Sequence, residues 1–223
     1  MIIDVETRGA VRVLHWRDGE NRCNAASMNR WHELLGELET IDGPLALVIV
    51  GEGKYFSNGL DLDRFTSHPD EAGPTVDGLH RLFGRLLLFP AYTIAAINGH
   101  AFAGGAMLTC ACDLRVMRAD RGYWCLPEVD LGLPLTDGMT AVVTARLPHT
   151  SAADAMLTGR RYGAAEALTR GIVDHIAPEP EVLDRAVAWA AEIAPKNRAV
   201  IAAHKRILFS AAAATCGWAP EAS

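Results

Sequence analysis

The sequence predicts a mixed α/β fold in which parallel strands alternate with helices, followed by a mainly helical C-terminal region. Continuous apolar runs at Leu45–Val50 and Thr93–Ile97 are typical of strands that are buried on both faces of a sheet. A glycine-containing turn and apolar residues at helical spacing follow each run. This repeated order indicates parallel ββα-type units whose helices pack on the sheet.

The first half of the chain adds further elements around these strands. Val11–Trp16 alternates in polarity as a strand does. Apolar residues recur at helical spacing over Met28–Leu38 and Leu79–Phe89, and Pro90 ends the second of these helices. Two prolines and a glycine predict a mobile loop over His68–Asp77.

The second half changes from strands to helices. A short strand over Tyr92–Ile97 leads into a small-residue helix over Gly104–Ala111, and Leu114–Met117 is expected to form another strand. Beyond Pro148 the pattern predicts helices throughout. They are expected at Ser151–Leu157, Ala164–Thr169, Glu181–Glu192 and Lys196–Ala213.

Composition indicates a globular intracellular protein. The 223 residues suffice for one domain with a sizeable core, and 50% of them are hydrophobic. The 27 acidic and 21 basic residues give a net charge of −6, which argues against a nucleic-acid partner. No apolar run has membrane-spanning length and no leader opens the chain. We therefore expect no membrane partner and a cytoplasmic location, with an organelle left open.

The five cysteines stand at irregular spacing, which argues against a disulfide framework and favours a reducing compartment. Cys110 and Cys112 form a C-x-C pair without a second pair nearby. We expect them to be small packing residues of a helix and expect no metal site.

Two glycine turns are the most informative feature. Phe56–Leu62 follows one buried strand, and Asn98–Gly105 joins the next buried strand to its helix. A helix start leaves backbone N–H groups without partners, and such groups can bind an anion or a developing oxyanion. Two donors from two loops would suit the enolate of a thioester.

These turns resemble those of the crotonase (enoyl-CoA hydratase/isomerase) family. The resemblance runs from about Val11 to Arg206, in the order and spacing of the family. The segments that carry it are Asn24-Ala25, Phe56–Leu62, Ala96–Ala101, Gly104-Gly105, Cys112–Arg115, Pro127–Val129, Leu131-Gly132, and residues within Ala153–Arg160 and Ala164–Asp174.

The resemblance implies a crotonase-like ββα spiral core over residues 1–148 that binds acyl-CoA. It also implies a helical region over 149–223 that closes the pocket and assembles a homotrimer or a dimer of trimers. Typical members carry further helices beyond the counterpart of Ile207, whereas this chain ends at Ser223 in an Ala-rich tail. We therefore expect part of the wall over the acyl pocket to be missing or supplied by a neighbouring subunit.

The resemblance also assigns site residues. The N–H groups of Leu60 and Gly104 are the implied oxyanion donors, and Glu128 is the implied acid/base. Because coenzyme A is part of the acyl-CoA substrate, no separate cofactor is expected. The implied substrate-binding residues are Asn24, Ala25, Ala26, Ser57, Asn58, Gly59, Leu60, Asp61, Leu62, Met107, Leu133 and Pro134.

The acid–base residues favour one reaction within the family. Family hydratases use two glutamates, of which the second is kept as Glu128 and the first is replaced by Met107. A thioether cannot transfer a proton and makes the pocket drier. Moving a double bond from C3 to C2 needs one carboxylate and an oxyanion hole. The run Glu128–Asp137 also resembles the short plant Δ3,Δ2-enoyl-CoA isomerases, so we expect such an isomerase, acting in fatty-acid degradation.

Other family activities stay open at this point: hydratase, dienoyl-CoA isomerase, thioesterase, or an acyl-CoA-binding paralogue without turnover. In dienoyl-CoA isomerases a second carboxylate would fall at Thr136. Asp130 and Asp137 are both candidates to cap a helix over Met139–Arg146, and we expect Asp137 to do so.

Four other polar residues have structural interpretations that compete with functional ones. His100 is expected to be hydrogen-bonded in place, and Asp61 is expected to hold backbone N–H groups of its turn. Lys205 and Arg206 are expected to belong to a solvated basic face, with binding of the CoA phosphates as the alternative.

Overall fold

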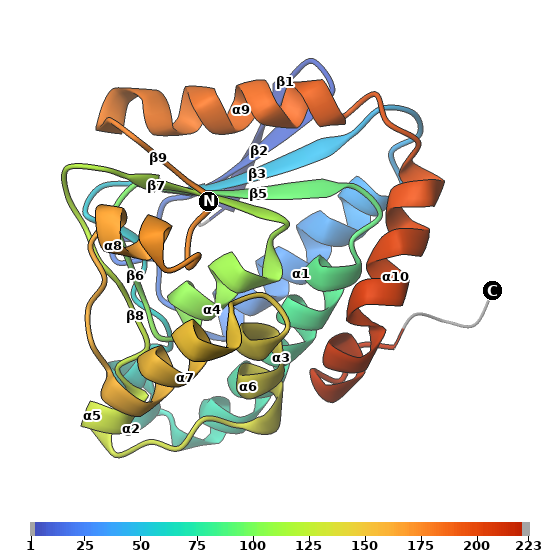
Figure 1. Cartoon of the computed structure of the whole chain (residues 1–223). Coiled ribbons are helices and arrows are strands. Elements are labelled where there is room, and N and C mark those ends of the chain that lie inside the picture. The colour runs from blue at the N-terminus through green and yellow to red at the C-terminus, as the bar shows by residue number, and fades with distance from the viewer. Residues whose placement is uncertain (1–2, 220–223) are drawn as a thin grey trace.

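The computed structural model describes residues 3–219, and a six-stranded sheet with helices on both faces forms its centre (Figure 1). The first two strands are antiparallel and all later neighbours are parallel. The order across the sheet is β1 (Ile3–Arg8), β2 (Val11–Trp16), β3 (Ala46–Gly51), β5 (Tyr92–Ile97), β7 (Leu114–Arg118) and β9 (His175–Ala177).

The central strands are buried on both faces, as their continuous apolar runs predict. On β3, Ala46, Val48 and Val50 belong to one hydrophobic cluster, together with residues of helix α9 (Val182–Ile193). Leu47 and Ile49 of the same strand belong to the larger cluster on the opposite face. Because side chains alternate along a strand, a strand between two helical layers needs apolar residues at every position.

A second, smaller sheet lies beside the first. Its parallel strands are β4 (Tyr55–Ser57), β6 (His100–Phe102) and β8 (Trp124–Cys125), in that order. Each follows a strand of the large sheet in the sequence, so the chain repeats the ββα order three times. This arrangement confirms the mixed α/β fold with ββα units.

The helices of the first half pack below the large sheet in the view of Figure 1. Helix α1 (Ala25–Glu39) begins at Asn24, whose side chain forms a reciprocal capping box with Ser27. The elements that follow are α2 (Leu62–Ser67), the 3₁₀ turn Pro69–Glu71, α3 (Ala72–Leu88) and α4 (Gly104–Ala111).

The prediction of a mobile loop over residues 68–77 was wrong. That segment holds the 3₁₀ turn and the first residues of α3. Pro74 is the third residue of the helix, where its missing N–H would have no intrahelical partner in any case. A proline in the first turn is therefore compatible with a helix, although the composition of residues 68–77 is typical of a loop.

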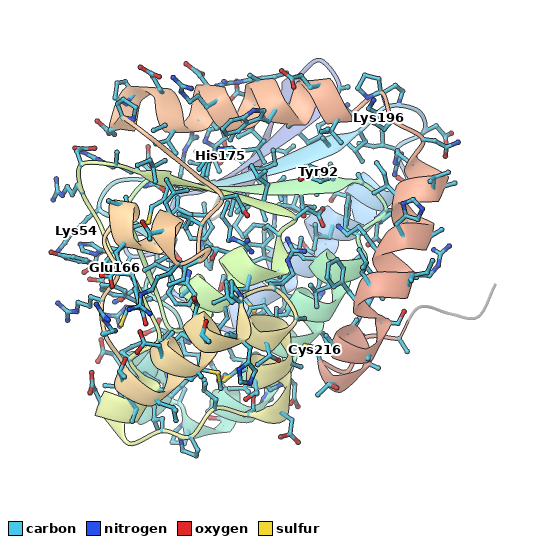
Figure 2. The ribbon with its side chains drawn as sticks, viewed as in Figure 1. Lys54, Tyr92, Glu166, His175, Lys196 and Cys216 are labelled. Atoms are coloured by element: carbon cyan, nitrogen blue, oxygen red, sulfur yellow. The ribbon has the colours of Figure 1, made fainter. Side chains whose placement is uncertain are left out.

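Residues after 148 are not helical throughout, contrary to the prediction. Strand β9 extends the large sheet by pairing with β7, and His175 of β9 stacks on Trp189 of α9 at 4.1 Å (Figure 2). A strand of three residues is too short to show a period of two. The C-terminal region therefore also completes the core, because β9 widens the sheet and α9 covers it.

The remaining helices surround the lower half of the molecule (Figure 1). They are α5 (Glu128–Leu131), α6 (Asp137–Thr144), α7 (His149–Thr158), α8 (Ala164–Thr169) and α10 (Arg198–Thr215), with the 3₁₀ turn Glu179–Glu181 before α9. Helix α10 packs against α3 and α6 of its own chain. Cys216, just after α10, donates its thiol to the carbonyl of Gly138 on α6 (Figure 2).

All five cysteines are free and buried, as expected for packing residues. Among the described residues, no helix combines the length and apolar character that crossing a bilayer requires.

Candidate active site

The first glycine turn is held in place by backbone hydrogen bonds to the segment before α1. Cys23 N donates to Gly59 O at 2.7 Å, and Asp61 N donates to Cys23 O at 3.0 Å. Gly59 has φ +76°, and a Cβ atom there would lie 2.8 Å from the Ala103 Cβ. Only glycine fits this position, because both its backbone conformation and its contact with the second turn exclude a side chain.

The second turn brings the start of α4 to the same place. A Cβ on Gly59 would lie 3.0 Å from Gly104 N, and one on Gly104 would lie 4.0 Å from Leu60 N. Ala103, just before the helix, has φ +50°, a conformation that costs free energy for a residue with a Cβ. Its N–H donates to Cys125 O at 3.0 Å, which holds this conformation.

The N–H groups of Leu60 and Gly104 donate to no acceptor within residues 3–219. Gly104 is the first residue of α4, where an N–H has no partner inside the helix. Two neighbouring backbone donors are therefore available to a ligand oxygen.

A cavity of about 470 Å³ opens beside these two donors, a size common for small-molecule sites. Leu60, Gly104 and Glu128 all line it, so the structure brings the three predicted catalytic positions together. The predicted binding residues Asn58, Leu62, Leu133 and Pro134 line it as well.

Glu128 is the first residue of α5 and is 9% exposed. Its Oε2 atom has no hydrogen-bond partner among the described residues. Burial raises the pKa of this carboxyl group from 4.5 to about 6, and a hydrogen bond with its own backbone opposes the shift. A buried carboxylate that has one oxygen free of partners and a raised pKa is suited to proton transfer near neutral pH.

Met107 does not line the cavity. Its side chain is fully buried in the hydrophobic core. The methionine therefore does not shape the cavity wall directly, and its place as the substitute for a catalytic glutamate stays a prediction from the family resemblance.

Other predicted binding residues stabilise the turns and do not line the cavity. Asn24 caps α1, and Ser57 is buried with its hydroxyl donating to Asn21 O at 2.6 Å. Asp61 caps α2 by accepting from Arg64 N at 3.3 Å, which confirms its expected role as a turn acid. Ala25, Ala26 and Gly59 also lie outside the lining.

The cap of α6 is Thr136 and not Asp137. The Thr136 hydroxyl accepts from Met139 N at 3.3 Å, whereas Asp137 is the first helical residue. A threonine at this position satisfies the same free N–H as an aspartate would. Asp137 instead places negative charge in the first turn, where the helix dipole favours it.

Lys205 belongs to no solvated face, and its ammonium group is paired inside the protein. Its side chain is buried on α10, with Nζ 2.7 Å from Asp113 Oδ2 and 3.3 Å from Ala91 O. Arg206, the next residue, is exposed as expected. His100 is partly exposed, and its Nδ1 atom accepts a hydrogen bond from Tyr123 N at 3.3 Å, as expected for a histidine that is hydrogen-bonded in place. Its ring also contacts the rings of Tyr55, Phe102 and Tyr123.

Sequence reasoning missed several residues of the cavity wall. Phe102 and Arg161 lie together there, with the guanidinium 5.6 Å from the ring centroid. Val76 and Met139 come from α3 and α6, and their apolar side chains give no signal that separates a cavity wall from a core. Arg22 also lines the cavity, but Glu20, Asp61 and Asp63 surround its guanidinium.

Another hollow of about 500 Å³ lies at the start of α10 and contains none of the predicted site residues. Arg198 spans part of it by donating to the carbonyls of Ile41, Gly43 and Pro90. In the described part of the chain, no group of three or more His, Cys, Asp or Glu side chains is arranged to hold a metal ion.

Comparison with known proteins links this geometry to one family. The family model described as enoyl-CoA hydratase/isomerase matches residues 7–216. A putative enoyl-CoA hydratase of Thermus thermophilus is 37% identical over 220 residues, covering 94% of this chain and 84% of that protein. The peroxisomal enoyl-CoA delta isomerase 2 of Arabidopsis thaliana is 35% identical over 174 residues, covering 74% of this chain and 72% of that protein.

Solved structures agree with this assignment of the fold. The apo structure of an enoyl-CoA isomerase of Mycobacterium tuberculosis superposes with a TM-score of 0.89 at 28% identity, covering 97% of this chain and 94% of that chain. A second structure of that mycobacterial protein, described as a probable enoyl-CoA hydratase, gives a TM-score of 0.91 and covers 97% of this chain and 92% of that chain. Names of both activities therefore occur among the similar proteins.

Proposed function

The chain belongs to the enoyl-CoA hydratase/isomerase family, whose members act on acyl-CoA thioesters, and from this premise we propose that it is a Δ3,Δ2-enoyl-CoA isomerase. It converts a 3-enoyl-CoA into the conjugated 2-enoyl-CoA, a step of fatty-acid degradation. One observation carries the proposal: Glu128 is the single buried carboxylate that lines the cavity within residues 3–219. The other lining carboxylate, Asp63, is exposed and lies 2.5 Å from Arg22.

One carboxylate suffices for isomerisation. Glu128 removes a proton from C2, and the electrons of that C–H bond form a double bond between C1 and C2 as the thioester carbonyl becomes an oxyanion. The oxygen of this dienolate accepts hydrogen bonds from Leu60 N–H and Gly104 N–H. The protonated Glu128 then returns the proton to C4, which leaves the double bond between C2 and C3. No atom is gained or lost, and no cofactor beyond the CoA of the substrate takes part.

Hydration of a 2-enoyl-CoA is the competing reaction, so the experiment must distinguish hydration from isomerisation. Purified protein is incubated with 3-hexenoyl-CoA and separately with 2-hexenoyl-CoA, and products are identified by mass and by the absorbance of the conjugated thioester. We expect conjugation of the first substrate and little hydration of the second. Rapid formation of 3-hydroxyhexanoyl-CoA would establish a hydratase, and tight binding without either product would establish a non-catalytic acyl-CoA-binding protein.

The oxyanion hole is tested by removing one N–H donor. Gly104→Pro lacks the N–H at the first helical position, where proline is otherwise tolerated. Gly104→Ala is the matched control, because it adds a Cβ in the same place, 2.9 Å from Leu79 Cδ2, and keeps the N–H. We expect the proline variant to lose roughly 10²–10³ in kcat relative to the alanine variant. Equal activity of the two folded variants would contradict the assignment.

A homotrimer, or a dimer of trimers, remains part of the proposal. Large apolar side chains are exposed on the C-terminal helices, with Ile207 at 81%, Leu157 at 76% and Leu208 at 68%. Exposed apolar residues that come together in a patch are typical of subunit interfaces, and we propose that these residues are covered by neighbouring copies of the chain. Sedimentation velocity on the full chain tests the assembly, and a monomer at micromolar concentration would contradict it.

A further inference from the structure

The cavity has a polar and an apolar side. Arg22, Asn58 and Asp63 come from the segment before α1, the first turn and the start of α2. Val76 on α3 and Met139 on α6 belong to the apolar side, together with Leu131 and Leu133. An acyl chain leaves water most favourably along the apolar side. The chain of a bound thioester is therefore directed toward the place where α3 and α6 meet.

His80 on α3 closes the gap between these two helices. Its Nε2 atom lies 2.8 Å from the hydroxyl oxygen of Thr136, the residue that caps α6 and lines the cavity. The imidazole ring also packs on Gly138, since a Cβ at that position would lie 3.1 Å from His80 Cγ. His80 itself does not line the cavity, so it supports the wall from behind.

The Thr136 hydroxyl can make two hydrogen bonds at once. Its oxygen accepts from Met139 N, and its proton can be donated to His80 Nε2 when that nitrogen is unprotonated. Burial lowers the pKa of His80, while the negative charge of Asp77 on the same helix opposes that shift. A neutral imidazole can accept the proton, which favours a stable contact between α3 and α6.

We propose that His80 is a positioning residue that limits the length of the acyl chain by keeping the α3–α6 gap closed through Thr136 and Gly138. This inference rests on the proposed acyl-CoA substrate class. Removing the imidazole would open the gap beside Val76 and Met139, and the distal carbons of a longer chain could then enter it and leave water.

The test measures binding of unreactive saturated thioesters, hexanoyl-CoA and dodecanoyl-CoA, to the full chain by isothermal titration calorimetry. We expect His80→Ala to strengthen dodecanoyl-CoA binding at least about tenfold, since a few newly buried methylenes suffice for that change. Hexanoyl-CoA binding should stay within about threefold. His80→Gln, which can still contact the Thr136 hydroxyl, should restore the selectivity of the original protein.

A second histidine provides the matched control. His32 on α1 is also partly buried, and its Nε2 atom lies 3.0 Å from the carbonyl oxygen of Gly78 on α3, so it joins α3 to α1 and not to α6. His32→Ala should change the affinity for both thioesters equally. If His80→Ala does not fold, the thioester affinities of Thr136→Ala are compared with those of Thr136→Ser. Serine keeps both the cap of α6 and the contact with His80, whereas alanine keeps neither.

The outcomes separate this inference from the proposed function. An unchanged ratio of the two affinities in folded His80→Ala, or the same change in His32→Ala, would overturn the role of His80. A shifted ratio in a protein that does not isomerise 3-hexenoyl-CoA would support the role of His80 and overturn only the isomerase assignment.

Discussion

The carboxylates of Asp113 and Glu128 are both largely removed from water, but only that of Asp113 is paired with a cation. Asp113, between α4 and β7, accepts hydrogen bonds from Thr93 N at 2.8 Å and Thr93 Oγ1 at 3.0 Å, and Lys205 Nζ lies 2.7 Å away. Glu128 has a free oxygen, and burial alone raises the pKa of its carboxyl group to about 6. The first group stabilises the fold by joining α10 to the sheet.

The difference supports Glu128 as the proposed catalytic carboxylate without reference to any relative. A buried charge that is fully paired is chemically inert, because its partners would have to be removed before it could accept a proton. A buried carboxylate without partners lowers stability, and it persists where a reaction uses it. Substitutions at the two positions should therefore affect different properties.

The largest effect on activity is expected at Glu128. Glu128→Gln keeps the shape of the side chain and removes the base, so isomerisation should fall by roughly 10²–10⁴ while acyl-CoA binding is retained. Initial rates with 3-hexenoyl-CoA and calorimetric binding of hexanoyl-CoA check the two halves of this expectation. Asp130→Asn, an exposed carboxylate on the same short helix, serves as the control. Activity within tenfold of the original protein would exclude Glu128 as the base.

The largest effect on stability is expected at Asp113. Asp113→Ala leaves Lys205 as an unpaired buried charge and should lower the free energy of unfolding by about 3–5 kcal/mol. Urea unfolding measures this change, and activity per folded molecule should stay the same. In the double variant with Lys205→Met, much of the loss should be recovered, since no buried charge is then left alone. Full additivity of the two substitutions would show that the pair is not coupled.

An intermediate effect concerns pH. With a pKa of about 6, Glu128 is ionised above that pH, so kcat/KM should rise through pH 6 to a plateau. Stability should change in the opposite sense. The folded state holds the proton more tightly than an unfolded chain with a pKa of 4.5, so stability falls as the pH rises between these values, by about 2 kcal/mol.

Glu128→Gln should abolish that decline in stability, which unfolding curves across the same pH range can show. A decline of equal size in the variant would assign the effect to other groups.

The smallest effect should come from making Glu128 more like Asp113. Leu131 is 53% exposed and lies three residues along the same helix, so Leu131→Lys places a cation within reach of Glu128. The acid limb of the pH–rate profile should move down by a few tenths of a pH unit, the size of an ordinary helical ion pair. Leu131→Met, which adds no charge, should leave the limb in place. A lysine variant with the same profile would mean that the two side chains do not meet.

Much of the site could be predicted from local sequence. The glycines at 59 and 104 and the buried strands before them depend on backbone conformation or on a short apolar run, and these are properties of a few consecutive residues. Glu128 was assigned only through the resemblance to the family, because by itself it is typical of an acid in a solvated loop. The first turn of α3 shows the limit of such reasoning, because Pro74 is compatible with a loop and with the start of a helix.

The walls of the cavity were decided by tertiary structure alone. Met107 and Met139 are both apolar helical residues, yet one lies in the core and the other lines the ligand space. Lys205 resembles a surface lysine in sequence until α10 packs against the rest of the chain and brings it to Asp113. Which residues face a ligand depends on how distant helices pack together, and a period of 3.6 residues specifies only that one face of each helix is buried.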